Sequence, residues 1–172
     1  QGYIVNEASY GSRIGEDTDL FDWLPKFRNQ MSDILACARQ DERLPAGRLN
    51  RIVMFKSCFP NNKFSGEGEP PGNPAGPQLT VWNAKATFAA LLDEFRKRPD
   101  TLFIYVTAPP LAPRREAIPV WRKWLAQVRG RYVTLEDSAR RARQFNNWVV
   151  DPDGWLKDYE GRNVVVFDYS VI

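Results

Sequence analysis

The sequence predicts an α/β domain: a three-layer sandwich with a parallel sheet of about four or five strands, flavodoxin-like in style. Three short apolar runs, at 51–56, 102–107 and 163–168, predict its main strands. Each run is almost continuously apolar, which indicates strands buried on both faces, as in a parallel sheet. Helical patterns separate the runs. Strands that alternate with helices form right-handed βαβ units, and these build such a sandwich.

Apolar residues spaced three and four apart predict the helices between these strands. Asp17 or Thr18 is the expected cap of the first helix. The motif Thr134-Leu-Glu-Asp137 resembles a capping box and should open a later helix. A weaker strand candidate covers residues 3–6. The expected helices cover residues 19–38, 81–98, 116–129 and 134–148, with a short one at 153–160.

One stretch has a composition unlike the rest. Residues 65–78, SGEGEPPGNPAGPQ, contain four glycines and four prolines. Such a segment has little means of contributing to a core, so it is expected to form a surface loop. An insertion is the favoured interpretation, and a lid is the alternative.

Length and composition favour one domain with a real core: 172 residues, 43% of them hydrophobic. No apolar run approaches the roughly 20 residues of a membrane span. The net charge of +3 does not by itself indicate nucleic-acid binding. The basic residues between 114 and 143 are interpreted as the solvent-exposed faces of helices. The next interpretation is that they bind an acidic surface of a protein partner. Cys37 and Cys58 are interpreted as buried free thiols, with a disulfide between them left open.

The chain contains no histidine, and this limits the chemistry it can perform alone. A serine or cysteine nucleophile needs a base within hydrogen-bond reach. Lys56 precedes Ser57 on a strand, so their side chains should point to opposite faces. A Ser–Lys pair is therefore not expected. No spaced cluster of carboxylates appears, so neither a metal nor a cofactor is predicted.

In a parallel α/β sheet, ligands bind beyond the carboxyl ends of the strands. Three segments should share that rim: residues 57–62, 108–113, and 168 onward. Residues 11–18 should join them if residues 3–6 form a strand.

The segments on this rim resemble sequence blocks of the SGNH (GDSL-like) hydrolases. Residues 11–18, GSRIGEDT, resemble the second block, and RIVMFKSCFPNN at 51–62 resembles the third. LFIYVTAPPL at 102–111 resembles the next strand and its Pro-rich turn. RRARQFNNW at 140–148 and NVVVFD at 163–168 resemble the stretch that leads to the final block.

This resemblance implies an oxyanion site. In the family the second-block glycine, here Gly15, donates its backbone N–H, and an asparagine of the third block, here Asn61 or Asn62, donates its side-chain N–H. The structural alternatives are a helix-entry turn for Gly15 and ordinary turn chemistry after Pro60 for the asparagines. Three weaker candidates lie at strand ends: Ser57, Cys58 and Asp168. The simpler role of Cys58 is that of a small buried residue, and that of Asp168 is a solvated or capping residue.

Two blocks of the family are not in the chain: the Gly-Asp-Ser-like nucleophile turn, which would lie before residue 1, and the Asp-x-x-His block, which would lie after residue 172. The expectation is therefore a single SGNH-like domain over 1–172, lacking its first strand and last helix and inactive as this chain. Within a longer polypeptide the resemblance implies cleavage of a small ester or an acetylated carbohydrate. The alternative is a non-catalytic scaffold or accessory subunit that binds other protein subunits. The start at Gln1 in place of Met favours either a secreted or periplasmic protein or a piece of a longer chain.

Overall fold

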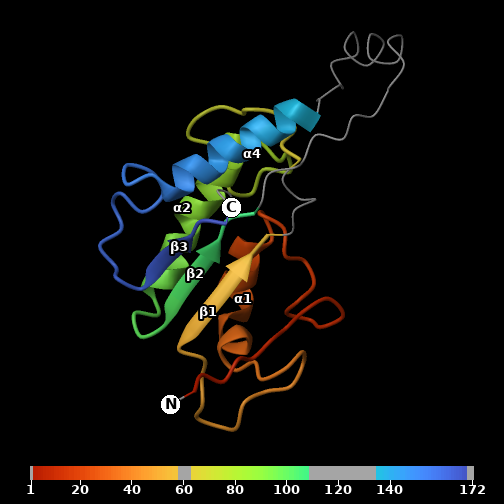
Figure 1. Cartoon of the computed structure of the whole chain (residues 1–172), viewed down its shortest axis with the longest axis vertical. Coiled ribbons are helices and arrows are strands. Elements are labelled where there is room, and N and C mark those ends of the chain that lie inside the picture. Colours follow the sequence, from red (N-terminus) through yellow and green to blue (C-terminus); the bar gives the residue numbers. More distant parts are fainter. Residues whose placement is uncertain (1, 58–62, 109–134, 170–172) are drawn as a thin grey trace.

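The structure is a computed structural model that describes residues 2–57, 63–108 and 135–169. Helices and strands alternate along the chain (Figure 1), so the predicted mixed α/β class is confirmed. The elements are α1 (Trp23–Leu35), β1 (Ile52–Lys56), α2 (Val81–Arg96), β2 (Leu102–Val106), α4 (Leu135–Val150) and β3 (Val164–Phe167).

The strands form a parallel sheet in the order β1-β2-β3. Ile52 pairs with Leu102 at the start of β1, and Phe103 pairs with Val164 at the start of β3. The three main strand predictions are confirmed to within one residue at each end. The described residues contain these three strands, and further strands of the expected four or five are not among them.

One face of the sheet carries the core. Phe55, Phe103, Tyr105 and Val164 point to this face and are almost fully buried against α1, α2 and α4. Aromatic rings dominate the contact, and the rings of Phe95 and Phe103 stack with centroids 4.1 Å apart. Each buried aromatic side chain removes a large apolar area from water and so stabilises the contact between the sheet and the helices.

The opposite face of the sheet exposes apolar side chains, so the expectation that the strands are buried on both faces is wrong for the described residues. Ile52 is 48% exposed, Met54 65%, Val165 41% and Phe167 52%. The topology explains this. Right-handed crossovers in the order β1-β2-β3 place α2 and α4 on the same face, and α1 packs beside α2 there (Figure 1).

Helix α1 begins later than predicted, at Trp23, with Asp22 at the N-cap position. Neither Asp17 nor Thr18 caps it. Asp17 has a left-handed φ of +47°, and both it and Thr18 lie in the turns that precede the helix; Asp22 has helical φ and ψ angles and makes no side-chain capping hydrogen bond. Helix α2 follows its prediction closely, and the Thr80 hydroxyl accepts a hydrogen bond from the backbone N–H of Asn83 at its start.

Two minor predictions are wrong. Residues 3–6 pair with no strand among the described residues, and residues 153–160 form a series of turns. A strand needs a neighbouring ladder to satisfy its backbone groups, and residues 3–6 have none here. Helix α4 is confirmed and continues two residues beyond Trp148. The helix expected at 116–129 lies outside the described residues.

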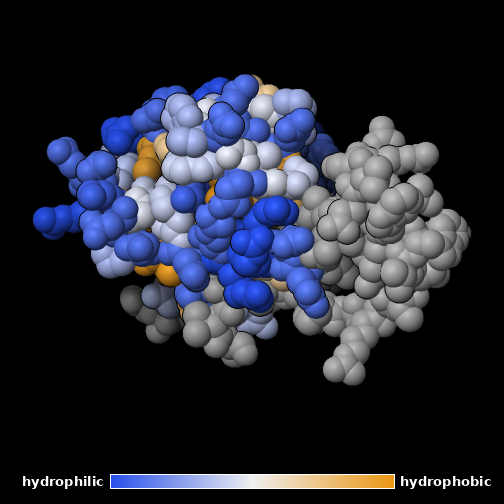
Figure 2. Space-filling model, turned by 90° about the horizontal axis from the view of Figure 1, so that it is seen from above, coloured by the Kyte–Doolittle hydropathy of each residue, from blue (hydrophilic) through white to orange (hydrophobic). Residues whose placement is uncertain are grey.

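Residues 65–78 contain no helix or strand and are mostly exposed, and hydrogen bonds fasten this segment to two helices. The backbone N–H of Asn73 donates to Asn83 Oδ1 on α2 at 2.8 Å, and Gln144 of α4 donates to the Glu67 carboxylate. Gly72 approaches α2 so closely that a Cβ there would lie 2.1 Å from the Trp82 carbonyl oxygen. Seen from above, the described surface is mostly hydrophilic, with small apolar patches (Figure 2).

Candidate functional site

The carboxyl ends of the three strands form the rim at which the sequence places candidate residues. Ser57 follows β1, Thr107 follows β2 and Asp168 follows β3. The register aligns these ends, since Lys56 pairs with Val106 and Val106 with Phe167. The structure therefore brings two of the predicted residues, Ser57 and Asp168, to the same edge of the sheet.

Ser57 is buried, with an exposed fraction of 1%, and its hydroxyl has a specific partner. The indole N–H of Trp23 donates to Ser57 Oγ at 3.0 Å. The hydroxyl of Tyr105 lies in the same buried region and has no well-aligned hydrogen bond among the described residues. Burial raises the pKa of Tyr105, and the nearby Ser57 hydroxyl opposes the rise. Ser57 thus acts as a polar link between α1 and the end of β1.

Asp168 is oriented by the neighbouring strand. The Thr107 hydroxyl donates to Asp168 Oδ1 at 2.8 Å and accepts the backbone N–H of Tyr169 at 2.8 Å. Helix α4 fastens the same end of β2, because Asn146 Nδ2 donates to the Ala108 carbonyl at 2.9 Å. The arrangement holds a carboxylate in a defined direction at the rim of the sheet.

Gly15 lies in a tightly packed turn before α1. Its backbone N–H donates to Ser12 Oγ at 3.0 Å, and Ser12 Oγ donates to the Ser9 carbonyl at 2.7 Å. A Cβ at position 15 would lie 1.9 Å from the Ser9 carbonyl oxygen, so the close approach itself requires glycine. The N–H that the resemblance assigns to an oxyanion is therefore engaged by a serine hydroxyl in this structure.

The buried Lys26 supports the same turn from α1. Its ammonium donates to the carbonyl oxygens of Ile14 at 3.0 Å and Glu16 at 2.6 Å. Desolvation lowers the pKa of Lys26, and the nearby acidic residues of this turn oppose that effect. A buried ammonium that donates hydrogen bonds to two backbone carbonyls fixes the turn relative to the helix.

Sequence reasoning missed Lys26 and the Trp23–Ser57 hydrogen bond. Lys26 lies three residues after Trp23 and directly before Phe27, within the apolar stripe of α1. A lysine in that stripe is a signal that could have been noticed, because a charged residue there must find partners or reach water. The partner of Trp23 depends on how the chain folds, and no local pattern indicates it.

The other residues that the sequence singled out are either outside the described residues or engaged within the fold. Asn61, Asn62 and Cys58 lie outside the described residues, and so do the basic residues at 114–131. Cys37 is a buried free thiol whose Sγ donates to the Gln40 carbonyl at 3.6 Å. Burial raises the pKa of Cys37, and Asp41 adds to the rise, which favours the unreactive thiol.

Comparisons with protein-family models, with curated proteins and with solved structures found no match. Within the three described segments, no group of three or more histidine, cysteine, aspartate or glutamate side chains could hold a metal ion. Across the same residues, no helix has both the length and the apolar character needed to span a bilayer.

Proposed function

We propose that this chain is an SGNH-hydrolase-like domain that contributes the oxyanion side of an ester-cleaving site and is inactive as these 172 residues. The observation that carries the proposal is the shared rim of a parallel sheet, where Ser57, Thr107 and Asp168 end neighbouring strands. Active sites of open α/β sheets form at this edge. The order of the sequence blocks along the chain adds to this support.

The proposed chemistry is acyl transfer. Gly15 and an asparagine at 61 or 62 would donate hydrogen bonds to the negative charge that develops on the carbonyl oxygen, and each such donor lowers the barrier by roughly 3–4 kcal/mol. For that, the Gly15 N–H must exchange Ser12 Oγ for the oxyanion. The substrate class is a small ester, including acetyl esters on carbohydrates.

The same proposal includes a larger sheet of four or five strands in three layers. Its support is the apolar face that Ile52, Met54 and Phe167 present on the side away from the helices. In α/β proteins with a parallel sheet, such a face is covered by a second layer of helices.

Hydrolysis of p-nitrophenyl acetate by the purified chain tests the proposal. We expect no release of p-nitrophenol above the buffer rate, because the sequence has no histidine to remove a proton from a serine hydroxyl. Turnover that a serine-reactive phosphonate abolishes would contradict this expectation. A matched Ser57→Ala variant would then show whether Ser57 is the nucleophile.

A specific observation favours a second function, that of a non-catalytic scaffold or subunit. The hydroxyl of Ser57 and the N–H of Gly15 both have partners inside the fold, so neither is directed to a substrate in this structure. The intact mass of the protein from its natural source separates the two functions. A mass equal to these 172 residues favours the scaffold, and a longer chain with Gly-Asp-Ser-like and Asp-x-x-His residues favours the hydrolase.

A further inference from the structure

Strand β1 lies at the edge of the described sheet, and its outer edge carries backbone groups available for pairing. The backbone N–H of Leu102 donates to the Arg51 carbonyl at 2.8 Å, so Arg51 directs its backbone groups toward β2. Residues alternate in a parallel strand. The N–H and C=O groups of Ile52, Met54 and Lys56 therefore point to the outer edge, where no strand of the described chain pairs with them.

A groove of about 380 Å³ runs beside this edge; we call it the edge groove. Ile52–Phe55 of β1 form one side, and Tyr3–Asn6 form the other. Trp23, Phe27 and Ile34 of α1 form its base. In Figure 1 the N-terminal segment, drawn in red, runs alongside β1 and is separated from it.

The N-terminal side of the edge groove is held in place by hydrogen bonds at its far end. Asn6 Nδ2 donates to Asn50 Oδ1 at 2.7 Å, and the backbone N–H of Gln40 donates to the Glu7 carbonyl at 2.7 Å. These bonds tie the segment to the turn after α1 and to the residue just before Arg51. They anchor the segment at Asn6 and Glu7, and the exposed residues Tyr3, Ile4 and Val5 continue from this anchor along the groove.

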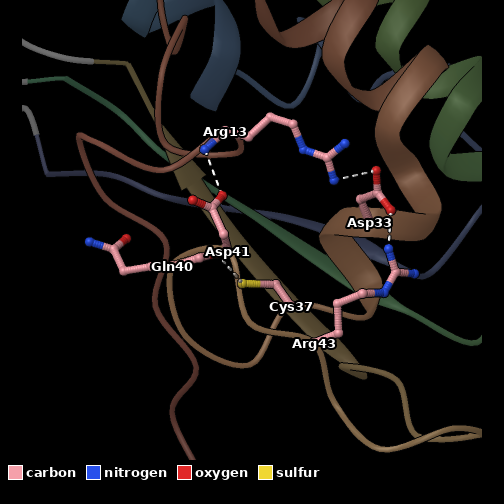
Figure 3. Close-up of polar contacts among 6 residues, drawn as sticks. All are labelled: Arg13, Asp33, Cys37, Gln40, Asp41 and Arg43. Atoms are coloured by element: carbon pink, nitrogen blue, oxygen red, sulfur yellow. Dashed lines mark hydrogen bonds and ion pairs between the residues drawn. The ribbon is translucent and has the colours of Figure 1, made fainter.

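The turn that carries Gln40 is itself fastened by polar contacts (Figure 3). The Cys37 thiol donates to the Gln40 carbonyl, and Asp41 accepts the backbone N–H of Arg13 at 2.8 Å. Asp33 of α1 binds the guanidinium groups of Arg13 and Arg43. The groove is therefore bounded by β1 on one side and, on the other, by a segment whose anchor at Asn6 and Glu7 is supported by this turn.

The lining of the edge groove is mainly apolar. Its lining includes no charged side chain among the described residues. Ile4 is 85% exposed and Val5 87%, and they face the same space as the exposed Ile52 and Met54. An apolar base, apolar sides and a row of outward backbone groups together suit an extended peptide, whose main chain pairs with β1 and whose side chains replace water.

We propose that the edge groove binds one extended apolar peptide segment from outside the printed chain, inserted as a strand between β1 and Tyr3–Asn6. The β1 strand of a second copy does not fit this role. The β1 edge of a second copy lies beside its own Tyr3–Asn6 segment, so two β1 edges cannot approach each other. The proposal concerns binding and does not depend on ester hydrolysis.

The test uses a synthetic peptide with a five-residue Val/Ile core, flanked by lysine pairs for solubility and labelled with a fluorophore. We expect saturable binding by fluorescence anisotropy and slower amide hydrogen exchange at Ile52, Met54 and Lys56. A control peptide with alternate core amides N-methylated should not bind, because it cannot complete the ladder. Absence of binding, equal binding of both peptides, or protection confined to amides outside β1 and Tyr3–Asn6 would overturn the proposal.

Variants at Met54 provide a matched pair. Met54→Pro removes the outward N–H while leaving the pairing with β2, as proline on an edge strand does. We expect it to weaken peptide binding roughly tenfold, the effect of one backbone hydrogen bond. Met54→Ala loses the same side chain but keeps the N–H, so Met54→Pro should bind roughly tenfold more weakly than Met54→Ala. Equal binding by both variants would overturn the proposal.

Two further measurements cover the cases in which Met54→Pro does not fold or a second copy fills the groove. If circular dichroism shows that Met54→Pro does not fold, the exchange pattern of the parent chain decides alone. Sedimentation of the peptide-free chain tests the other occupant. A dimer that protects the amides of Ile52 and Met54 would show that a second copy fills the groove, against the proposal.

Discussion

Two different roles could each explain why position 15 is a glycine. The resemblance assigns its N–H to an oxyanion, whereas the packing requires glycine because a Cβ would lie 1.9 Å from the Ser9 carbonyl and 2.7 Å from Ser12 Oγ. The second requirement holds whether or not the chain is an enzyme. Stability measurements can therefore separate packing from catalysis.

We expect Gly15→Ala to destabilise the fold by roughly 2 kcal/mol or more, since backbone must shift to admit the methyl group. Urea unfolding followed by tryptophan fluorescence measures this. Gly66→Ala is the control, because a Cβ there would make an ordinary contact, 3.9 Å from Thr80 Cγ2. Equal stability of Gly15→Ala and the parent chain would show that the turn is looser than the structure indicates.

The Glu94 carboxylate on α2 binds Arg28 of α1, and this contact should make the stability of the fold depend on pH. Burial acts to raise the pKa of Glu94, but hydrogen bonds from Lys97 and Arg28 outweigh it and lower the pKa below 4.5. The ionised carboxylate is thus favoured in the folded state. Its contribution to stability is complete above the unfolded pKa of about 4.5 and is lost as the pH falls through the folded pKa.

Between roughly pH 5 and pH 3, paired carboxylates become protonated. Over this window we expect the melting temperature of the parent chain to fall more than the melting temperature of Glu94→Gln, because glutamine has no proton to take up. Asp93→Asn serves as the control, because the neighbouring Asp93 carboxylate is exposed and pairs with Arg96 at the surface. It should follow the parent profile. Parallel profiles for the parent chain and Glu94→Gln would contradict the assigned shift.

At the scale of elements, Asn163 joins the end of α2 to the start of β3. Its buried Nδ2 donates to the carbonyl oxygens of Phe95 at 3.0 Å and Arg98 at 2.9 Å, and its Oδ1 accepts the Tyr159 hydroxyl at 2.7 Å. The last carbonyls of a helix lack partners within the helix. One side chain therefore satisfies the C-terminus of α2 and positions β3.

We expect Asn163→Asp to cost roughly 2–3 kcal/mol at neutral pH, since a buried carboxylate would lose both donated hydrogen bonds and face two carbonyl oxygens that repel its charge. Lowering the pH should recover part of the loss, because the protonated acid can donate one hydrogen bond. Chemical denaturation at pH 7 and pH 4.5 measures both effects. Asn147→Asp, exposed on α4, should change stability by less than about 0.5 kcal/mol.

The strands and α2 could be predicted from the sequence because local signals determine them. Continuous apolar runs give β1, β2 and β3, and α2 has a threonine cap and a basic last turn. The start of α1 could not be predicted, because it depends on a left-handed Asp17 and on Lys26 reaching back to the preceding turn. Such long-range contacts override local propensity.

In the candidate site, too, some features could be predicted from local sequence and others could not. Ser57 and Asp168 could be placed at one edge, since the carboxyl ends of parallel strands lie together. Their partners could not be predicted, because Trp23 reaches Ser57 from a helix 34 residues earlier and Thr107 reaches Asp168 across 61 residues. Sequence patterns fix the edge on which a residue lies, while burial and hydrogen bonding follow from packing between elements.

At the scale of the whole molecule, the exposed sheet face is the feature that distinguishes the chain from a closed α/β sandwich. Val165 and Phe167 of β3 lie on this face, away from the edge groove beside β1. Contiguous apolar surface of this kind promotes association or binds apolar dyes. The face should therefore dominate the solution behaviour of the isolated chain.

We expect the parent chain to associate as its concentration rises and to enhance the fluorescence of an anilinonaphthalene sulfonate dye. The double variant Val165→Thr with Phe167→Thr should reduce both effects, because hydroxyl groups replace apolar surface while the β-branched threonine preserves the strand. Val150→Thr is the matched control, since Val150 is 40% exposed on α4 and lies off the sheet. Sedimentation velocity and dye titration measure the outcome. If all three proteins behaved alike, the exposed face would not govern association, and the argument for a covering layer would lose its support.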